Sequence, residues 1–265
     1  MEESKKIWGV PIFISVFIGT LWMLWCALNI PRFLIPVWAI WFITIGIFSV
    51  VGILLGLGIS GRKAGIFINE RKLMSISRFQ IAMWTLIILS AYFAIYIGRL
   101  REGSVEDPLA IAIDWNLWIV MGLSGASFVG KSLISGKKGA MRPADTEFES
   151  MKAAKDLKEN QDDIKENRIG VLYANKCIRD ARFTDMFEHD EMRNTRFIDM
   201  GKLQMFFFTV VALLSYGTLL FQVIYTQDPA QINALPEVSE GLVAILAISH
   251  AGFLASSGIT NTPVK

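Results

Sequence analysis

The hydrophobic residues of this chain are gathered in long runs that alternate with shorter polar segments. Each run holds about 20 residues, the length that an α-helix needs to cross the hydrocarbon core of a bilayer. Segments this apolar must satisfy their backbone hydrogen bonds internally, so the runs predict helices and no strands. The pattern predicts an all-α integral membrane protein with six transmembrane helices arranged as hairpins. The runs lie near 9–30, 37–60, 79–98, 116–134, 204–225 and 241–259.

Composition supports this prediction, since 53% of the 265 residues are hydrophobic and 19% are charged, a more apolar balance than soluble domains have. The first run follows Lys5 and Lys6 but is too long for a signal-peptide core, so we expect an uncleaved anchor. The expected organisation is a first transmembrane hairpin at 1–60, a basic cytoplasmic loop at 61–78, a second hairpin at 79–136, a charged helical cytoplasmic segment at 137–200, and a third hairpin with a short tail at 201–265.

The basic residues are unevenly distributed among the polar segments. The segment 60–78 contains five Lys and Arg residues beside the single acid Glu70, and 135–142 contains three more basic residues, whereas 226–240 contains none. The positive-inside rule therefore places both termini, 60–78 and 135–203 in the cytoplasm. We expect a multi-pass protein of a bacterial inner membrane.

Two of the hairpins resemble each other in sequence. Gln80, Thr85 and Tyr92 of the third run have counterparts at matching offsets in the fifth run, and the fourth and sixth runs also align. The segments 77–136 and 201–260 therefore look like two copies of one hairpin in the same orientation, related by a pseudo-two-fold axis along the membrane normal. The fifth-run counterparts are Gln204, Thr209 and Tyr216.

The stretch Gly125–Ser132 reads GASFVGKS, which matches the phosphate-binding pattern G-x-x-x-x-G-K-[ST]. A P-loop needs a strand before it and a helix after it, and this stretch lies near the end of an apolar run. The corresponding stretch of the second copy, 250–257, has no Gly-Lys pair. We interpret the match as chance and expect Lys131 to reach toward the cytoplasmic headgroups. The sequence predicts no enzyme, no cofactor, no metal site and no catalytic residues.

Small residues recur every four positions in three of the runs, which places them along one face of each helix. Such ladders let helix backbones approach closely in membranes, so we expect the even-numbered helices to form the packed centre and the odd-numbered ones to lie nearer lipid. The positions are Gly52, Gly56 and Ser60 in the second run, Gly122, Ala126 and Gly130 in the fourth, and Ala247, Ala251 and Ala255 in the sixth.

A few polar residues lie within the runs and are candidates for a pore or for interhelical hydrogen bonds. His250 is the only ionisable residue deep inside a run, and such residues are often functional; the alternatives are a pore-lining, pH-sensing or proton-relay residue and a neutral packing element bonded to Ser124 or Ser249. Gln80 and Gln204, with Thr85 and Thr209, either line a pore mouth or bond across helices.

The cytoplasmic segment 143–200 is expected to be mostly helical. Leu157, Ile164, Val171 and Ile178 recur every seven residues, a stripe typical of self-association or of partner binding. The alternative is an amphipathic helix that packs on its own chain or lies at the membrane surface. The acid-rich stretch 185–191 is expected to be a solvated face rather than a divalent-ion site.

These features favour an oligomeric, channel-like or membrane-perturbing inner-membrane protein that is regulated through its cytoplasmic segment. The alternative is a membrane scaffold that recruits a cytoplasmic protein through 143–200. A transporter or membrane enzyme is disfavoured, because no Asp or Glu lies inside any run. The expected partners are the lipid bilayer, other copies of the chain and a cytoplasmic protein, and not nucleic acid.

Overall fold

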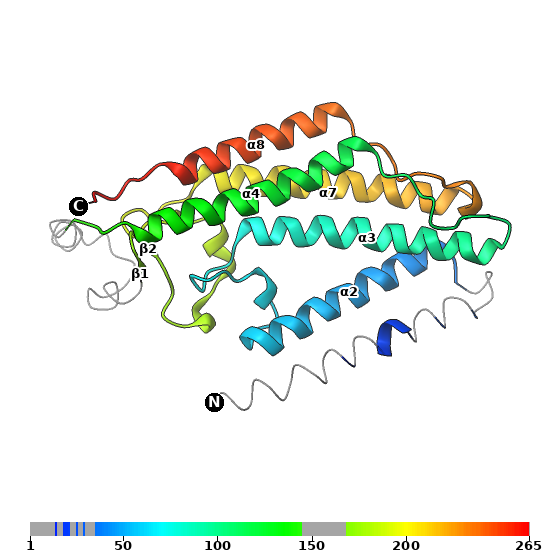
Figure 1. Ribbon diagram of the computed structural model, residues 1–265, viewed down its shortest axis with the longest axis horizontal. Coiled ribbons are helices and arrows are strands. Elements are labelled where there is room, and N and C mark those ends of the chain that lie inside the picture. Colours follow the sequence, from blue (N-terminus) through cyan, green and yellow to red (C-terminus); the bar gives the residue numbers. More distant parts are fainter. Residues whose placement is uncertain are drawn as a thin grey trace. The chain divides into compact units, whose positions relative to one another are not determined.

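The computed structural model describes residues 35–144 and 168–264, together with residues 14, 18–21, 25 and 29 of the first apolar run. Over these residues the chain is mostly helical (Figure 1). The long helices are α2 (Val37–Ser60), α3 (Ile76–Glu102), α4 (Trp115–Ala140), α7 (Met200–Thr226) and α8 (Glu240–Gly258). The short elements are strands β1 (Arg168–Ile169) and β2 (Leu172–Tyr173) and the 3₁₀ turns η1 (Gly65–Phe67), η2 (Ile178–Asp180), η3 (Phe183–Met186) and η4 (Pro229–Gln231).

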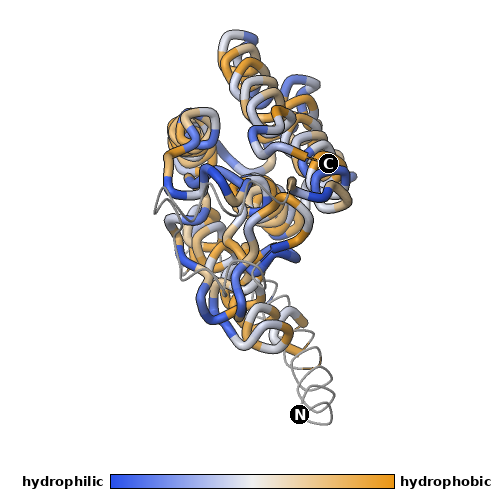
Figure 2. Tube along the Cα trace, turned by 90° about the vertical axis from the view of Figure 1, so that its left-hand side faces the viewer, coloured by the Kyte–Doolittle hydropathy of each residue, from blue (hydrophilic) through white to orange (hydrophobic). Residues whose placement is uncertain are grey.

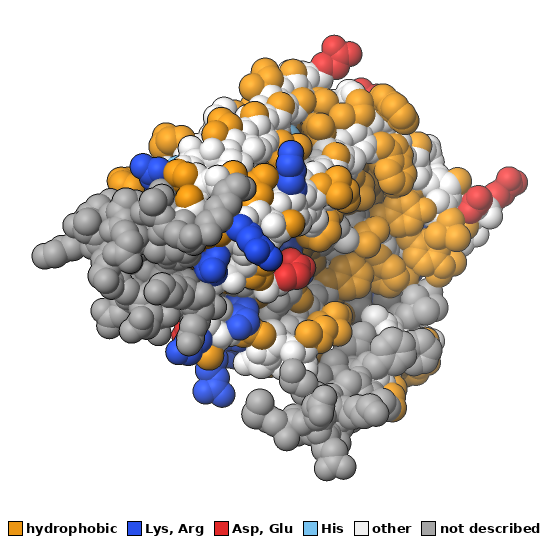
Figure 3. Space-filling view, turned by 60° about the vertical axis from the view of Figure 1, so that its left-hand side comes forward, with side chains coloured by type: hydrophobic (Ala, Val, Ile, Leu, Met, Phe, Trp, Pro, Cys, Tyr) orange, Lys and Arg blue, Asp and Glu red, His pale blue; other side chains and the backbone are white. Residues whose placement is uncertain are grey.

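All five long helices are long and apolar enough to cross a membrane. Hydrophobic residues dominate the helices in Figure 2, and hydrophobic side chains cover a broad part of the surface seen in Figure 3. Side chains such as Phe42, Val50 and Ile59 of α2 remain exposed, which suits a helix whose surroundings are lipid. The predicted helical fold is confirmed for these five runs, and most of the first run, 9–30, lies outside the described residues.

The chain forms two compact units, here called unit 1 and unit 2. Helices α3, α4 and α7 contribute residues to both, because the division falls within them. Unit 1 consists of Met1–Ile66, Ala82–Ile119 and Val211–Glu240, and unit 2 of Phe67–Ile81, Val120–Val210 and Gly241–Lys265.

In unit 1 the buried Arg99 of α3 bonds two loops, one between α3 and α4 and the other between α7 and α8. Its guanidinium donates to the carbonyls of Asp107 and Ala110 in the loop 103–114 and to the carbonyl of Ile232 in the loop 227–239. The two loops also pair with each other, since Ala112 and Ala234 form a parallel β-bridge. The two terminal nitrogens of one buried guanidinium thus bind three carbonyl oxygens and fix loops that have little regular structure.

The helix pairs α3–α4 and α7–α8 share local features. Helices α3 and α7 each contain 27 residues. Tyr92 of α3 donates its hydroxyl to the carbonyl of Leu109 at 2.8 Å, and Tyr216 of α7 donates to the carbonyl of Pro236 at 3.2 Å. Each tyrosine therefore bonds the loop that follows its own helix, at matching positions in the two pairs.

The small-residue ladders do not form the packed centre of the chain. In α4 and α8, Gly122, Ala126, Ala251 and Ala255 are exposed. Gly130 is the exception, because a Cβ added there would lie 3.1 Å from Leu254 of α8. Ala247 is intermediate in exposure. The helix-packing role of the exposed ladder positions stays a prediction.

In α2 the ladder faces the chain's own following loop instead of another helix. A Cβ on Gly56 would lie 2.7 Å from the carbonyl oxygen of Arg62 and 2.9 Å from the nitrogen of Gly65, and one on Gly52 would lie 3.2 Å from Ile66. Ser60 donates its hydroxyl to the carbonyl of Gly56.

The expectation that the even-numbered helices form the centre is wrong. Helix α3 is the most buried of the five, with 44% of its apolar window buried, and α2 is the least, with 11%. Large side chains of α3, among them Trp84, Ile88 and Ile95, are almost completely buried. Large buried side chains make more dispersion contacts than small ones do. The bulky residues of α3, and not the small-residue ladders, therefore occupy the most buried positions.

Unit 2 has a small apolar core to which an irregular segment contributes. Ile76, Met186, Met205 and Phe253 come from α3, η3, α7 and α8 and pack together. The segment 168–199 lies outside the long helices and consists of the β1–β2 hairpin, 3₁₀ turns and isolated bridges.

The prediction that 143–200 is mostly helical is wrong for 168–199. Val171 lies in the hairpin turn, fully buried, and Ile178 begins η2, so these two positions share no helical stripe; Leu157 and Ile164 lie outside the described residues. Gly170 explains part of the difference. It has a φ of 62°, and a Cβ there would lie 2.4 Å from the carbonyl oxygen of Gly139, so this tight turn against the end of α4 requires glycine.

Candidate functional site

Unit 2 contains a cluster of buried charged side chains centred on two consecutive acids, Asp190 and Glu191. Both acids belong to the segment 168–199 and are 7% and 2% exposed. Their cationic partners come from other segments of the unit. We call these two acids and the partners Arg71, Lys131, Lys138 and Lys202 the ion-pair cluster.

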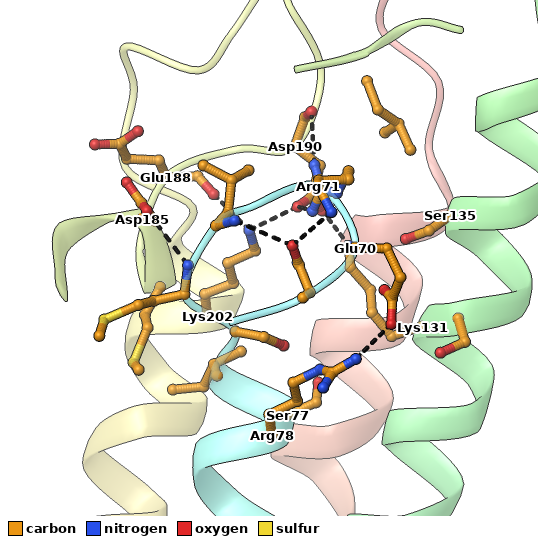
Figure 4. A pocket seen from close by; sticks show the side chains of 18 of the residues that line it. Glu70, Arg71, Ser77, Arg78, Lys131, Ser135, Asp185, Glu188, Asp190 and Lys202 are labelled. Atoms are coloured by element: carbon orange, nitrogen blue, oxygen red, sulfur yellow. Dashed lines mark hydrogen bonds and ion pairs between the residues drawn. The ribbon is translucent and has the colours of Figure 1, made fainter. Parts of the chain in front are cut away.

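Asp190 interacts with three cations at once (Figure 4). The Arg71 guanidinium donates to Oδ1 at 2.5 Å, and the Lys202 ammonium donates to the same oxygen at 3.0 Å. The Lys131 ammonium donates to Oδ2. Arg71 precedes α3, Lys131 lies on α4 and Lys202 lies on α7, so one carboxylate joins three separate segments.

A tight turn directs Arg71 into the cluster. The Asn69 side chain accepts from the backbone N–H groups of Arg71 and Leu73, and Lys72 adopts a φ of 60°. Asparagine favours such turns because its side chain bonds the backbone two residues ahead. The Arg71 guanidinium also donates to the carbonyls of Tyr173 and Asp190, which ties this turn to the segment 168–199.

Glu191 connects α4 to the chain that follows α8. The Lys138 ammonium donates to Oε1 of Glu191 at 2.6 Å. Oε2 accepts from the backbone N–H groups of Asn261 and Thr262 and from the Thr262 hydroxyl. Together, Asp190 and Glu191 contact groups on or next to α3, α4, α7 and α8.

The electrostatic balance around Asp190 is unusual. Burial by itself raises the pKa of the Asp190 carboxyl, but the charges of Lys202, Lys131 and Arg71 hold that pKa well below its ordinary value of 3.8. Asp190 is therefore ionised near neutral pH. One buried carboxylate thus faces three buried cations.

A cavity of about 400 Å³ lies beside the ion-pair cluster. Arg71, Lys131, Asp190 and Lys202 form part of its lining, and apolar side chains form another part. Ser77 also lines it; the Ser77 hydroxyl is buried and has no hydrogen-bond partner among the described residues. The apolar lining residues include Met74, Phe128, Met186 and Phe253.

Four helices of unit 2 also share a buried polar network around His250. Ser127 of α4 lies 2.5 Å from Nδ1 of His250, and the Gln80 amide of α3 lies 2.9 Å from Nε2. The same Gln80 amide donates to the Thr209 hydroxyl of α7 at 2.6 Å. Because an amide nitrogen only donates, Nε2 accepts and Nδ1–H donates to Ser127. A neutral histidine fits these bonds, as the interhelical alternative requires.

The other polar candidates of the sequence do not join this network. Gln204 and Thr85, the counterparts of Gln80 and Thr209, are exposed. The Ser124 hydroxyl donates to the carbonyl of Val120 in its own helix, and the buried Ser249 hydroxyl has no partner among the described residues. Matching positions of the two helix pairs therefore have different environments.

One interpretation of the charged residues was wrong. The acid-rich stretch is not a solvated face, because Asp185, Asp190 and Glu191 are all buried. The Lys131 ammonium bonds Asp190 and Ser257, and its position relative to the lipid headgroups stays a prediction. Within 35–144 and 168–264, no group of three or more His, Cys, Asp and Glu residues could hold a metal ion.

Sequence reasoning missed Arg71, Lys138 and Lys202 as partners of the acids, and Ser127 as a partner of His250. Only the consecutive acids preceding a membrane-length helix could have drawn attention to the cluster, and adjacency alone does not reveal burial.

No known protein family, curated protein or solved structure matches this chain.

Proposed function

We propose that the chain is an oligomeric, channel-like protein of a bacterial inner membrane, in which the segment 168–199 controls the membrane helices through the ion-pair cluster. The observation that carries this proposal is the position of Asp190 and Glu191. These neighbouring residues of one irregular segment contact groups on or next to four membrane-length helices. A displacement of the segment is therefore coupled to all four.

The membrane topology of this proposal rests on the five apolar helices and on the charge distribution. The positive-inside rule assigns 60–78 and 135–203 to the cytoplasm, and these ranges contain Arg71, Lys138, Asp190, Glu191 and Lys202. The cluster then lies at the cytoplasmic helix ends, where a soluble signal or a second protein has access to it.

The proposed two-copy arrangement is supported by the matching features of the two helix pairs. Helices α3 and α7 have equal length, and Tyr92 and Tyr216 each bond the following loop. Ala112 and Ala234 form a parallel bridge. Two equivalent segments related by a two-fold axis parallel to them would pair in this way. A pseudo-two-fold arrangement along the membrane normal accounts for all three features.

The control mechanism follows from the charges of the cluster. With Asp190 in place, Arg71, Lys131 and Lys202 are held together by a common partner. Without it they are like charges in a buried site, and they repel. Movement of the segment 168–199 away from the helices therefore favours separation of the helix ends. The polar network of Gln80, Ser127, Thr209 and His250 would then be the first interhelical region to admit water.

The test is solute flux through liposomes that contain the full chain or the variant Asp190→Asn. We expect the variant to raise the flux of a small fluorescent anion or of potassium by about tenfold or more, a typical size for an allosteric coupling. Asp180→Asn is the matched control, because Asp180 is an exposed acid of the same segment. This variant should leave the flux unchanged. Folded, inserted protein that passes no solute in either form contradicts the channel proposal.

A further inference from the structure

We propose that the cavity beside the ion-pair cluster binds a phosphate monoester that carries an apolar or sugar-like group. The phosphate would interact with Arg71, Lys131 and Lys202, and the remainder of the ligand would occupy the apolar part of the cavity. Two sources share this chemistry, a phosphatidic acid headgroup and a soluble phosphate ester. The proposal concerns binding and does not depend on channel activity.

The first argument is that three cations converge on one carboxylate. The side chains of Arg71, Lys131 and Lys202 are 8%, 13% and 5% exposed, and the carboxylate that they share is Asp190. The cavity lining as a whole is balanced, because it also contains the acids Glu70, Asp185 and Glu188 and the cation Arg78. The positive charge is concentrated where the three cations meet. A phosphate monoester, which carries a charge of about −1.5 to −2 at pH 7, would bind at that point.

The second argument is the supply of unused donors. Among the described residues, the Lys131 ammonium donates to Asp190 and Ser257, and the Lys202 ammonium donates to Asp190 and to the carbonyl of Glu188. Each ammonium has three N–H donors, so each retains one.

The Ser77 hydroxyl strengthens this second argument. It is 1% exposed, lacks a partner within the described part of the chain, and belongs to a residue of the cavity lining. A buried hydroxyl without a partner costs free energy, and phosphate oxygens accept hydrogen bonds from hydroxyl and ammonium groups. Lysine and serine donors thus meet at one cavity.

The remaining titratable groups of the lining are three acids, one arginine and one histidine. Glu70 accepts from Arg78, so these two charges compensate each other. The Asp185 carboxylate accepts from the backbone N–H groups of Met74 and Arg182. His189 has Nδ1 at 3.5 Å from Asp199. Glu188 completes the set of acids; its backbone carbonyl bonds Lys202.

The apolar lining indicates that the ligand is larger than inorganic phosphate. A volume of about 400 Å³ falls in the range of small-molecule sites, and Met74, Phe128, Met186 and Phe253 contribute apolar surface. The Arg78 guanidinium lies 5.7 Å from the centre of the Phe128 ring. Lys131 belongs to the GASFVGKS stretch, yet the glycines of that stretch lie inside α4, so the site is not a P-loop.

The experiment measures thermal unfolding of the full chain in two formats. In detergent, the probes are glycerol 3-phosphate and inorganic phosphate. In nanodiscs, phosphatidylcholine bilayers are compared with bilayers containing phosphatidic acid or phosphatidylglycerol. Stabilisation by phosphatidic acid alone identifies a lipid, and stabilisation by glycerol 3-phosphate identifies a soluble ester; both support the proposal. Equal stabilisation by phosphatidylglycerol, a phosphodiester, overturns the monoester assignment.

Three variants test the location of the site. Lys131→Gln should weaken binding at least tenfold while leaving Asp190 two cationic partners, and Ser77→Ala should weaken binding severalfold with little effect on folding. Lys137→Gln removes an exposed positive charge from the same helix and should leave binding unchanged. The proposal fails if no probe stabilises the protein, or if Lys131→Gln and Ser77→Ala both bind as tightly as the unmodified chain.

Discussion

At the scale of single residues, Asp190 joins three separate segments of unit 2. Its carboxylate is buried and accepts from Arg71, Lys131 and Lys202. Replacing a buried ion cluster by apolar groups can be neutral, but removing one partner leaves charge uncompensated. Because three cations bond this carboxylate, we expect the negative charge of Asp190 to contribute more to folding stability than the size of its side chain does.

We predict that Asp190→Asn lowers the free energy of unfolding by about 3–5 kcal/mol, the usual cost of breaking a buried ion pair from one side. Asparagine keeps the shape but cannot neutralise the three cations. Chemical or thermal unfolding in detergent measures the change. Asp180 is an exposed acid of the same segment whose carboxylate accepts from the backbone N–H of Cys177, a bond that the amide oxygen of asparagine can keep. Asp180→Asn should therefore change stability by less than about 0.5 kcal/mol. Equal effects of the two variants would contradict the role of Asp190.

The pH dependence of this difference is a further prediction. The native pKa of Asp190 lies well below its ordinary value of 3.8, so its stabilisation is complete above the ordinary value and is lost as the pH falls through the native pKa. The stability difference between the unmodified chain and Asp190→Asn should not decline from pH 7 to about pH 5 and should shrink only below the ordinary value. A difference that declines between pH 7 and pH 5 would contradict this prediction.

At the scale of elements, α2 shows that one ladder serves a local contact. Gly56 approaches the backbone of Arg62 and Gly65, so the loop after α2 folds back on the helix. The sequence pattern predicted small side chains on one face, which is correct, but it assigned that face to another helix. Periodicity reports which residues share a face and cannot identify what the face contacts.

We predict that Gly56→Ala destabilises the protein by about 1–3 kcal/mol, because the added methyl group meets backbone atoms that cannot move without shifting the loop. Gly46→Ala in the same helix is the control. A Cβ on Gly46 meets nothing within 4 Å, so this change should be neutral or stabilising by up to about 1 kcal/mol. Thermal unfolding of both variants measures the contrast, and equal midpoints would show that the loop does not pack on Gly56.

At the scale of the whole molecule, topology decides whether the cavity and the ion-pair cluster are accessible from the cytoplasm. Cys177 is a free, exposed cysteine in the segment 168–199, and the loop 103–114 contains the exposed Ser104. The proposed topology places these two positions on opposite sides of the membrane. They therefore provide a direct test of orientation.

We predict that, in a Cys26→Ser background, a membrane-impermeant maleimide labels Cys177 only after the inner membrane is permeabilised. In a chain that also carries Cys177→Ser and Ser104→Cys, the new cysteine should be labelled without permeabilisation. The positive-inside rule is the physical reason, since basic segments are retained in the cytoplasm. Labelling of both positions from the same side would contradict the topology.

The sequence by itself determined the positions of α2, α3, α4, α7 and α8, because long apolar runs have few ways to satisfy their backbone hydrogen bonds. It also identified Gln80, Thr209 and His250 as candidates for a pore or for interhelical hydrogen bonds. Only the tertiary structure decided that Asp190 and Glu191 are buried and paired. Their partners are distant in sequence, with Arg71 separated from Asp190 by 119 positions and Lys131 by 59. Composition and periodicity describe neighbours along a helix or strand, whereas the cluster forms only when distant segments fold together and exclude water.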